Sequence, residues 1–190
     1  MTSVVVPFAG SAGKTRLDTS ARTRRELALA RLADVLAAAT VVGRTVVVTP
    51  DAEGIDLMGA DVLDDPGGGQ GAAVTAALAR LDGAVLVVNA DVPCVTPFDL
   101  RALLDATPPR GLALVEALDG TTNALGLSTP AVFEPLYGPD SARRFLALPV
   151  ETVSVAIPNI ADDVDTQADI DRLQLRCGPR TQSILAGTAP

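Results

Sequence analysis

Acidic residues occupy two distant places in the chain where they could hold a divalent cation. Asp91 directly follows an apolar, strand-like run, whereas Asp163 and Asp165 lie much later, just before a helical segment. A carboxylate at the tip of a buried strand projects into the cleft at the strand ends, which favours Asp91 as a Mg²⁺ ligand over a residue that merely ends the strand. Asp163 and Asp165 repel each other, and a bound cation would hold them together. The alternative for this second group is ordinary negative charge at a helix N-terminus.

A positively charged loop near the start of the chain could bind phosphate groups. The chain contains a single lysine, Lys14, which lies beside glycines after the first apolar run and is followed closely by Arg16. Both side chains could neutralise phosphate oxygens. Gly13-Lys14-Thr15 matches the end of a Walker loop, but Phe8 stands where that motif requires glycine, so a P-loop is the weaker interpretation. A tight turn with solvated charges is the plainer alternative.

A glycine-rich loop precedes a helix made of small residues in the first half of the chain. Gly67, Gly68 and Gly69 are consecutive, and Gln70 follows them at the start of that helix. Such a loop leaves backbone N–H groups exposed at the positive end of a helix, where a nucleotide base or ribose could lie. A flexible surface loop explains the same residues equally well.

Composition excludes several classes of function. The 190 residues contain no histidine, so imidazole bases, Ser-His-Asp triads and histidine-bound zinc cannot operate. A net charge of −8 argues against a nucleic-acid partner. Cys94 and Cys177 are far apart in sequence and are expected to be free thiols. The first residues lack the basic segment of a secretion signal, and no run is long enough to span a membrane, so we expect a cytoplasmic protein with no membrane partner.

The elements that must position these residues alternate between strands and helices. Hydrophobic residues make up 48% of the chain but aromatic residues only 3%, which is typical of a buried parallel sheet built from Val, Leu, Ile and Ala. The alternation predicts such a sheet with helices on both faces, and irregular spacing over 120–138 predicts a small β-rich insertion. We expect one domain over 1–177 and a loose tail over 178–190. The predicted strands are 4–6, 45–49, 61–63, 84–88, 112–115, 123–127 and 152–157, and the predicted helices are 19–39, 71–81, 96–106, 141–148 and 166–176.

Taken in order, these motifs resemble the 2-phospho-L-lactate guanylyltransferase family of coenzyme F420 biosynthesis and its phosphoenolpyruvate-using relatives. The resemblance covers most of residues 4–176 and places the chain among molybdopterin-type nucleotidyltransferases. It implies a Rossmann-like three-layer α/β/α fold, similar to that of the nucleotide-diphospho-sugar transferases. The motifs that carry it are Lys14-Thr15-Arg16-Leu17, Arg25-Glu26-Leu27, Asp65-Pro66-Gly67-Gly68-Gly69, Ala90-Asp91-Val92-Pro93, Gly138-Pro139-Asp140-Ser141 and Asp163-Val164-Asp165-Thr166.

The resemblance implies a role for each candidate residue. Lys14 and Arg16 would neutralise the triphosphate of GTP, and the loop from Gly67 to Gln70 would hold its guanine and ribose. Mg²⁺ would be bound by Asp91, Asp163 and Asp165. The acceptor, a phosphorylated three-carbon acid, would have its carboxylate and phosphate contacted by Thr122, Gly138 and Ser141.

The chain departs from the family pattern in two places, which keeps alternatives open. Phe8-Ala9-Gly10 stands where the family usually has Lys-Pro-Leu, and Gln70-Gly71 stands where Leu-Asn is common. A molybdopterin-type nucleotidyltransferase with another acceptor and a catalytically inactive nucleotide-binding homologue are therefore competing hypotheses. The residues do not choose between phosphoenolpyruvate and 2-phospho-L-lactate, and they leave open whether the chain forms a homodimer.

Overall fold

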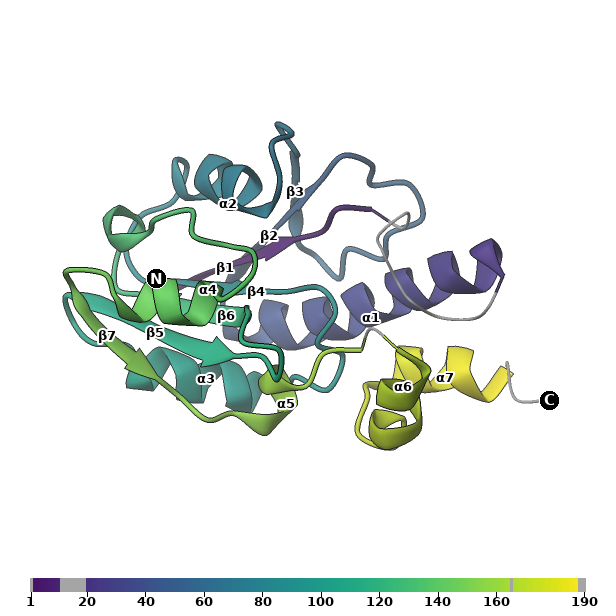
Figure 1. The fold of residues 1–190 in the computed structure, drawn as a ribbon. Helices are drawn as coiled ribbons and strands as arrows, with labels where there is room; N and C mark the ends of the chain where they lie inside the picture. Colours follow the sequence, from purple (N-terminus) through teal and green to yellow (C-terminus); the bar gives the residue numbers. More distant parts are fainter. Residues whose placement is uncertain (1, 11–19, 165, 188–190) are drawn as a thin grey trace.

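A mixed β-sheet forms the centre of the molecule (Figure 1). The structure is a computed structural model that describes residues 2–10, 20–164 and 166–187. Within these residues seven strands follow the order β3-β2-β1-β4-β6-β5-β7. β6 runs antiparallel to both of its neighbours, and every other pair is parallel. The strands are β1 (Ser3–Pro7), β2 (Arg44–Thr49), β3 (Asp61–Asp64), β4 (Val85–Val88), β5 (Gly111–Glu116), β6 (Thr122–Leu127) and β7 (Glu151–Ser154).

Helices cover both faces of the sheet, which confirms the predicted three layers (Figure 1). On one face, β-branched and leucine side chains of the sheet pack with α1 (Ala21–Val42), α3 (Pro97–Ala106) and α5 (Pro158–Ala161). On the other face the sheet packs with α2 (Gln70–Leu78) and α4 (Ser141–Leu146). The inner strands are apolar throughout because both of their faces are covered: Val4, Val5 and Val6 of β1 are fully buried.

Local capping signals fix the starts of two helices near the predicted site. The hydroxyl of Thr96 accepts a hydrogen bond from the Asp99 backbone N–H, and Pro97 occupies the first turn of α3, as predicted. Thr166 and Asp169 form the same reciprocal cap at the start of α6 (Gln167–Leu173). These caps satisfy N–H groups that a helix leaves without partners.

The C-terminal segment corrects one expectation. We expected a loose tail over 178–190, and this was wrong for most of it, because α7 (Pro179–Gly187) is a helix that lies against α1. Asp34 of α1 accepts hydrogen bonds from the backbone N–H groups of Arg180, at 3.1 Å, and Thr181, at 2.8 Å. The cap of α7 thus comes from a residue far away in sequence, and local composition could not reveal it.

The region in which a β-rich insertion was expected holds one strand of the main sheet. β6 supplies the antiparallel strand, and the short 3₁₀ helix η1 (Pro130–Val132) follows it. Between β6 and β7 the described residues form no further strand. None of the described helices has the length and apolar character that crossing a membrane requires.

Candidate functional site

The candidate residues gather where the direction of strand order changes in the sheet. β1 is followed outward by β2 and β3 on one side and by β4 on the other, and ligands of open α/β sheets bind at the carboxyl ends of strands at such a point. Asp91 follows the end of β4. Because β6 is antiparallel to β4, with Val88 paired to Ala124, the first residues of β6 lie at this same edge.

The two acidic segments lie side by side here. The backbone N–H of Val164 donates a hydrogen bond to the carbonyl oxygen of Asp91 at 3.0 Å, so Asp163 lies next to the tip of β4. The side chains of Asp91 and Asp163 are half-buried. Asp165 lies outside the described residues, and among the residues that are described no group of three acids or cysteines could hold a metal. The role of Asp91, Asp163 and Asp165 as metal ligands stays a prediction.

Arginines that sequence reasoning missed hold the second acidic segment through the Asp162 carboxylate and the Val164 carbonyl group. Asp162 is buried and accepts hydrogen bonds from Arg172, at 2.5 Å, and from Arg176, at 2.9 Å. The guanidinium of Arg31, buried in α1, donates to the carbonyl oxygen of Val164. Arg31 stands within the apolar stripe of α1, and a charge in such a stripe was the available signal for a buried partner.

The glycine loop presents bare backbone at the start of α2. Gly67, Gly68 and Gly69 have φ values of 79°, 88° and 88°, which side-chain-bearing residues rarely adopt. Gly69 is the N-cap of α2, and no side chain caps the helix there. N–H groups of the first turn of α2 are therefore placed for a ligand with acceptor atoms.

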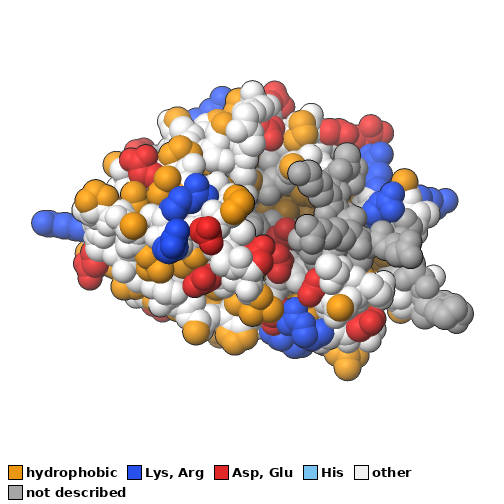
Figure 2. Space-filling model, in the orientation of Figure 1, with side chains coloured by type: hydrophobic (Ala, Val, Ile, Leu, Met, Phe, Trp, Pro, Cys, Tyr) orange, Lys and Arg blue, Asp and Glu red, His pale blue; other side chains and the backbone are white. Residues whose placement is uncertain are grey.

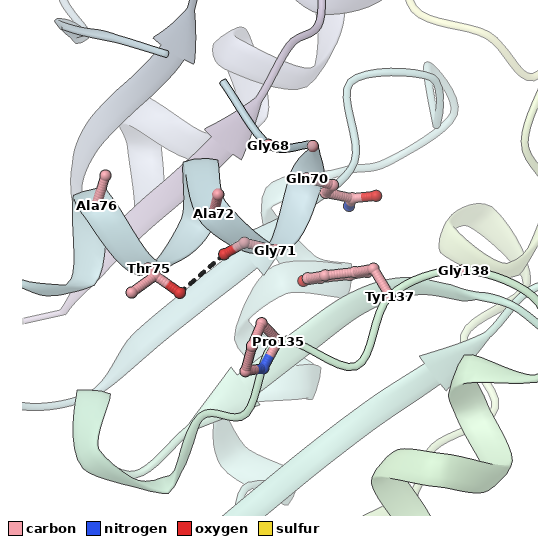
Figure 3. A pocket seen from close by; sticks show the side chains of 10 residues that line it. Gly68, Gln70, Gly71, Ala72, Thr75, Ala76, Pro135, Tyr137 and Gly138 are labelled. Carbon is pink, nitrogen blue, oxygen red and sulfur yellow. Dashed lines mark hydrogen bonds between the residues drawn. The ribbon is translucent and has the colours of Figure 1, made fainter. Parts of the chain in front are cut away.

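A pocket of about 770 Å³ opens between this loop and residues 135–138 (Figure 3). Gly71 permits the close approach of the two walls, since a Cβ there would lie 2.8 Å from Cβ of Pro135. In Figure 3 Tyr137 extends from one wall toward the first turn of α2. Burial raises the pKa of its hydroxyl well above the usual value, so the group stays neutral and can donate a hydrogen bond. The lining residues are Gly68, Gly69, Gln70, Gly71, Ala72, Thr75, Ala76, Pro135, Tyr137 and Gly138.

The side chain of Gln70 joins the glycine loop to the tip of β4. Its amide nitrogen donates to Oδ1 of Asn89 at 2.6 Å, and Nδ2 of Asn89 in turn contacts Oδ1 of Asn123 at 3.2 Å. Sequence reasoning assigned no role to either asparagine. The available signal was Asn123 itself, because asparagine is uncommon in buried strands.

The structure brings together the three residues assigned to the acceptor. The hydroxyl oxygens of Thr122 and Ser141 lie 3.0 Å apart, and both residues are buried. The backbone N–H of Ser141 donates to the carbonyl oxygen of Gly138 at 3.1 Å. Gly138 lines the pocket, and the two buried hydroxyls lie next to it in the fold. Lys14 and Arg16, the predicted phosphate contacts, lie outside the described residues.

Exposed arginines offset the acidic charge near this edge. Figure 2 shows basic side chains gathered over α4, which carries the exposed Arg143 and Arg144. Arg144 also donates to the carbonyl oxygens of Tyr137, at 3.2 Å, and Pro139, at 2.9 Å, and so fixes one wall of the pocket. Positive side chains at a pocket attract anionic ligands even when the whole chain is acidic.

Comparison with known families identifies the family of this chain. The model of the MobA-like NTP transferase domain matches residues 19–155. This chain belongs to the MobA-like NTP transferase family. Curated relatives that this chain resembles include the phosphoenolpyruvate guanylyltransferase of Conexibacter woesei, which is 40% identical over 88% of this chain and 83% of its own length. The corresponding enzyme of Streptomyces coelicolor is 37% identical over 97% of this chain and 95% of its own.

Solved structures confirm the fold expected for the MobA-like NTP transferase family. A protein of Desulfovibrio desulfuricans assigned to the nucleotide-diphospho-sugar transferases superposes with a TM-score of 0.76 at 14% identity, over 98% of this chain and 94% of that one. A Mycobacterium tuberculosis protein solved in complex with manganese superposes with a TM-score of 0.62 at 23% identity, over 90% and 96% of the two chains. At these identities the comparison establishes the shared architecture alone.

Proposed function

We propose that this chain transfers GMP from GTP to phosphoenolpyruvate or 2-phospho-L-lactate, with release of pyrophosphate, in coenzyme F420 biosynthesis. The observation that carries the proposal is the hydrogen bond from Val164 to Asp91, which brings two distant acidic segments to the edge where the glycine loop and the Thr122–Ser141 pair also lie. The names of the curated relatives support GMP as the transferred group and phosphoenolpyruvate as an acceptor.

The donor set at this edge suits Mg²⁺. This ion is typically held by one or two carboxylates together with substrate phosphates and water, and Asp91 and Asp163 provide two carboxylates on adjacent segments. Asp165 would add a third. When bound, the ion would neutralise phosphate charge between the nucleotide and the acceptor. The manganese complex of a protein with the same fold supports the use of a divalent cation.

The glycine loop is proposed to hold the guanosine part of GTP. Bare backbone at Gly67 to Gly69 lets a base and ribose approach closely, and the first-turn N–H groups of α2 can donate to their acceptor atoms. The neutral hydroxyl of Tyr137 adds a donor on the opposite wall. Lys14 and Arg16 are proposed to neutralise the triphosphate.

The acceptor is proposed to lie against Thr122, Gly138 and Ser141. An oxygen of its phosphate attacks the α-phosphorus of GTP in line, the bond from that phosphorus to the bridging oxygen breaks, and the electron pair leaves with pyrophosphate. Hydroxyl groups and positive side chains around the phosphates stabilise the developing charge. The attacking oxygen is already anionic, so no general base is needed, which fits a chain without histidine.

Cytoplasmic location is also proposed. Cys94 and Cys177 are free and buried, and their Sγ atoms lie 3.8 Å apart. Buried free cysteines are usual in proteins of a reducing compartment, which supports this location.

The reaction can be tested by following pyrophosphate release with Mg²⁺, each nucleoside triphosphate and each acceptor in turn. We expect release with GTP and with phosphoenolpyruvate or 2-phospho-L-lactate. Asp91→Asn should lower turnover by at least about a hundredfold, because the charge that binds the cation is lost. Asp105→Asn, an exposed change on α3, is the matched control. Absence of release with every pair would favour the inactive-homologue hypothesis, and release only with another acceptor would favour a different nucleotidyltransferase.

A further inference from the structure

Asn123 lies at the junction of three chain segments at the proposed site. Its backbone carbonyl oxygen accepts a hydrogen bond from the backbone N–H of Asn89 at 2.9 Å, and its Oδ1 accepts from Nδ2 of Asn89 at 3.2 Å. Its own Nδ2 donates to the carbonyl oxygens of Ile160, at 2.9 Å, and Ala161, at 3.4 Å. The one side chain is therefore bound to the β4 tip and to α5.

A shift in the register between β5 and β6 determines where this side chain points. Val115 of β5 pairs with Ala124, but Glu116 pairs with Thr122, so Asn123 is the extra residue of a β-bulge. Bulges redirect a side chain away from the regular face of a sheet. Leu125, two residues later, packs with the helices of the opposite layer, whereas Asn123 reaches α5. Burying an asparagine in a strand costs free energy unless its polar groups are hydrogen-bonded. The partners of Asn123 therefore indicate why it is placed here.

The partners of Asn123 lead directly to the two carboxylates. Asn89 precedes Asp91 by two residues, and Ala161 precedes Asp163 by two residues. The bond from Val164 to Asp91 joins the same two segments beyond the carboxylates. Hydrogen bonds thus connect these segments on both sides of the acidic residues and form a closed ring.

We infer that Asn123 is a positioning residue that sets the separation of the Asp91 and Asp163 carboxylates. It acts through Asn89 on one side and through Ile160 and Ala161 on the other. The inference rests on the proposed function, since it assumes that these carboxylates bind a divalent cation. Groups hydrogen-bonded directly to metal ligands typically contribute about ten- to a hundredfold in metal affinity, and Asn123, which is one step further from the carboxylates, should contribute at the low end of that range.

The test measures Mn²⁺ binding directly, from the free-ion signal in electron paramagnetic resonance, without substrates. We expect Asn123→Ala to weaken Mn²⁺ binding by about tenfold. Leu125→Ala is the matched control, because it removes a fully buried side chain from the same strand but touches no hydrogen bond of the ring. It should lower thermal stability while leaving Mn²⁺ affinity unchanged. Circular dichroism establishes that each variant is folded at the measuring temperature.

A second variant decides the question if Asn123→Ala does not fold. Asn89→Ala removes the side-chain bonds to Asn123, to Gln70 and to the carbonyl oxygen of Thr122 but keeps the backbone bond to Asn123. It should therefore weaken Mn²⁺ binding too, but by less. In the pyrophosphate assay both variants should need more Mg²⁺ for half-maximal turnover, and high Mg²⁺ should restore much of their activity. The Leu125→Ala enzyme should show neither effect.

The outcomes separate this inference from the proposed function. Wild-type protein that binds no Mn²⁺ in an Asp91-dependent way would overturn both. Wild-type protein that binds Mn²⁺ and releases pyrophosphate, together with folded Asn123 and Asn89 variants of unchanged Mn²⁺ affinity, would overturn the inference and leave the function standing.

Discussion

The two sides of the proposed site are built in opposite ways. On the nucleotide side, the loop at Gly67 and Gly69 has open space around its α-carbons, and no side chain caps α2. On the acidic side, Asp162 is held by two arginines, and both backbone polar groups of Val164 are hydrogen-bonded. The contrast fits the proposed ligands: a planar base can adapt to bare backbone, whereas Mg²⁺ requires near-octahedral geometry and therefore carboxylates at fixed positions.

The fixed side extends into the C-terminal helices. α6, α7 and the first part of α1 share a small apolar cluster that includes Leu27, Val164 and Cys177, and Asp34 caps α7 from α1. The acidic segment therefore depends on residues well beyond the site, whereas the glycine loop depends mainly on its own backbone angles. Substitutions on the two sides should consequently affect different properties.

The largest expected effect is on the fixed side, at Gly178. A Cβ added there would lie 2.3 Å from Cγ of Asp34, whose carboxylate caps α7 through the N–H groups of Arg180 and Thr181. Gly178→Ala should therefore lower the free energy of unfolding by about 3 kcal/mol, because the packed backbone and carboxylate must separate. Urea denaturation measures it. Gly187→Ala, with nothing within 4 Å of the new Cβ, is the control and should cause no loss. Equal stability of the two variants would show that the acidic side is not held as rigidly as the comparison of the two sides requires.

A smaller loss is expected when one carboxylate of the fixed side is neutralised. Asp162→Asn leaves Arg172 and Arg176 without their shared anion and should lower the free energy of unfolding by about 2 kcal/mol. The figure is below that of a fully buried pair because the arginine side chains are 42% and 41% exposed. Asp171→Asn, an exposed change on α6 beside Arg172 that alters only a surface hydrogen bond with Gln167, is the control. If Mn²⁺ affinity fell together with stability, the position of the cation would also depend on the ion pairs of Asp162.

The nucleotide side should show the reverse pattern at Gly69. Its φ of 88° and ψ of −177° lie in a region that only glycine adopts readily, so Gly69→Ala should cost about 1 kcal/mol of stability as the loop shifts. The affinity for GTP, measured by calorimetry, should fall about tenfold, since the first-turn N–H groups of α2 move with the loop. Gly59 has the same φ of 88° in another loop, so Gly59→Ala creates a similar backbone strain away from the site. This control should leave GTP affinity unchanged. Equal GTP affinity in both variants would remove the loop from the nucleotide site.

Sequence reasoning succeeded where the signal is local. The valine runs of β1 and β2 and the Thr96-Pro97 cap of α3 each contain within a few residues everything that specifies the element. It failed for α7, because the group that caps this helix is Asp34 on α1, and only the folded chain brings the two together.

The same distinction applies to the site. The acidic segments and the glycine loop stand out as short motifs, and the positions of Thr122 and Ser141 follow from a family resemblance. The contribution of Asn123 depends on a bulge that shifts the β5–β6 register, and that of Arg31 depends on which carbonyl group faces it in the folded chain. Neither the bulge nor the carbonyl partner can be predicted from the neighbouring residues. Reasoning from one sequence could therefore mark these two side chains as unusual but could not identify their partners.

The smallest expected effect distinguishes charge from packing on the fixed side. Raising KCl from about 0.1 M to about 1 M shortens the screening length to about 3 Å, and it should weaken the Asp162 ion pairs because the arginines are partly exposed. Amide hydrogen exchange in α6 should then become faster. The corresponding protection free energy should fall by less than about 1 kcal/mol. Amides in α2, which contains no charged residue, should not respond. If α6 were as insensitive to salt as α2, the arginines would stabilise the acidic segment through packing and hydrogen-bond geometry, and the two sides would differ in burial and not in charge.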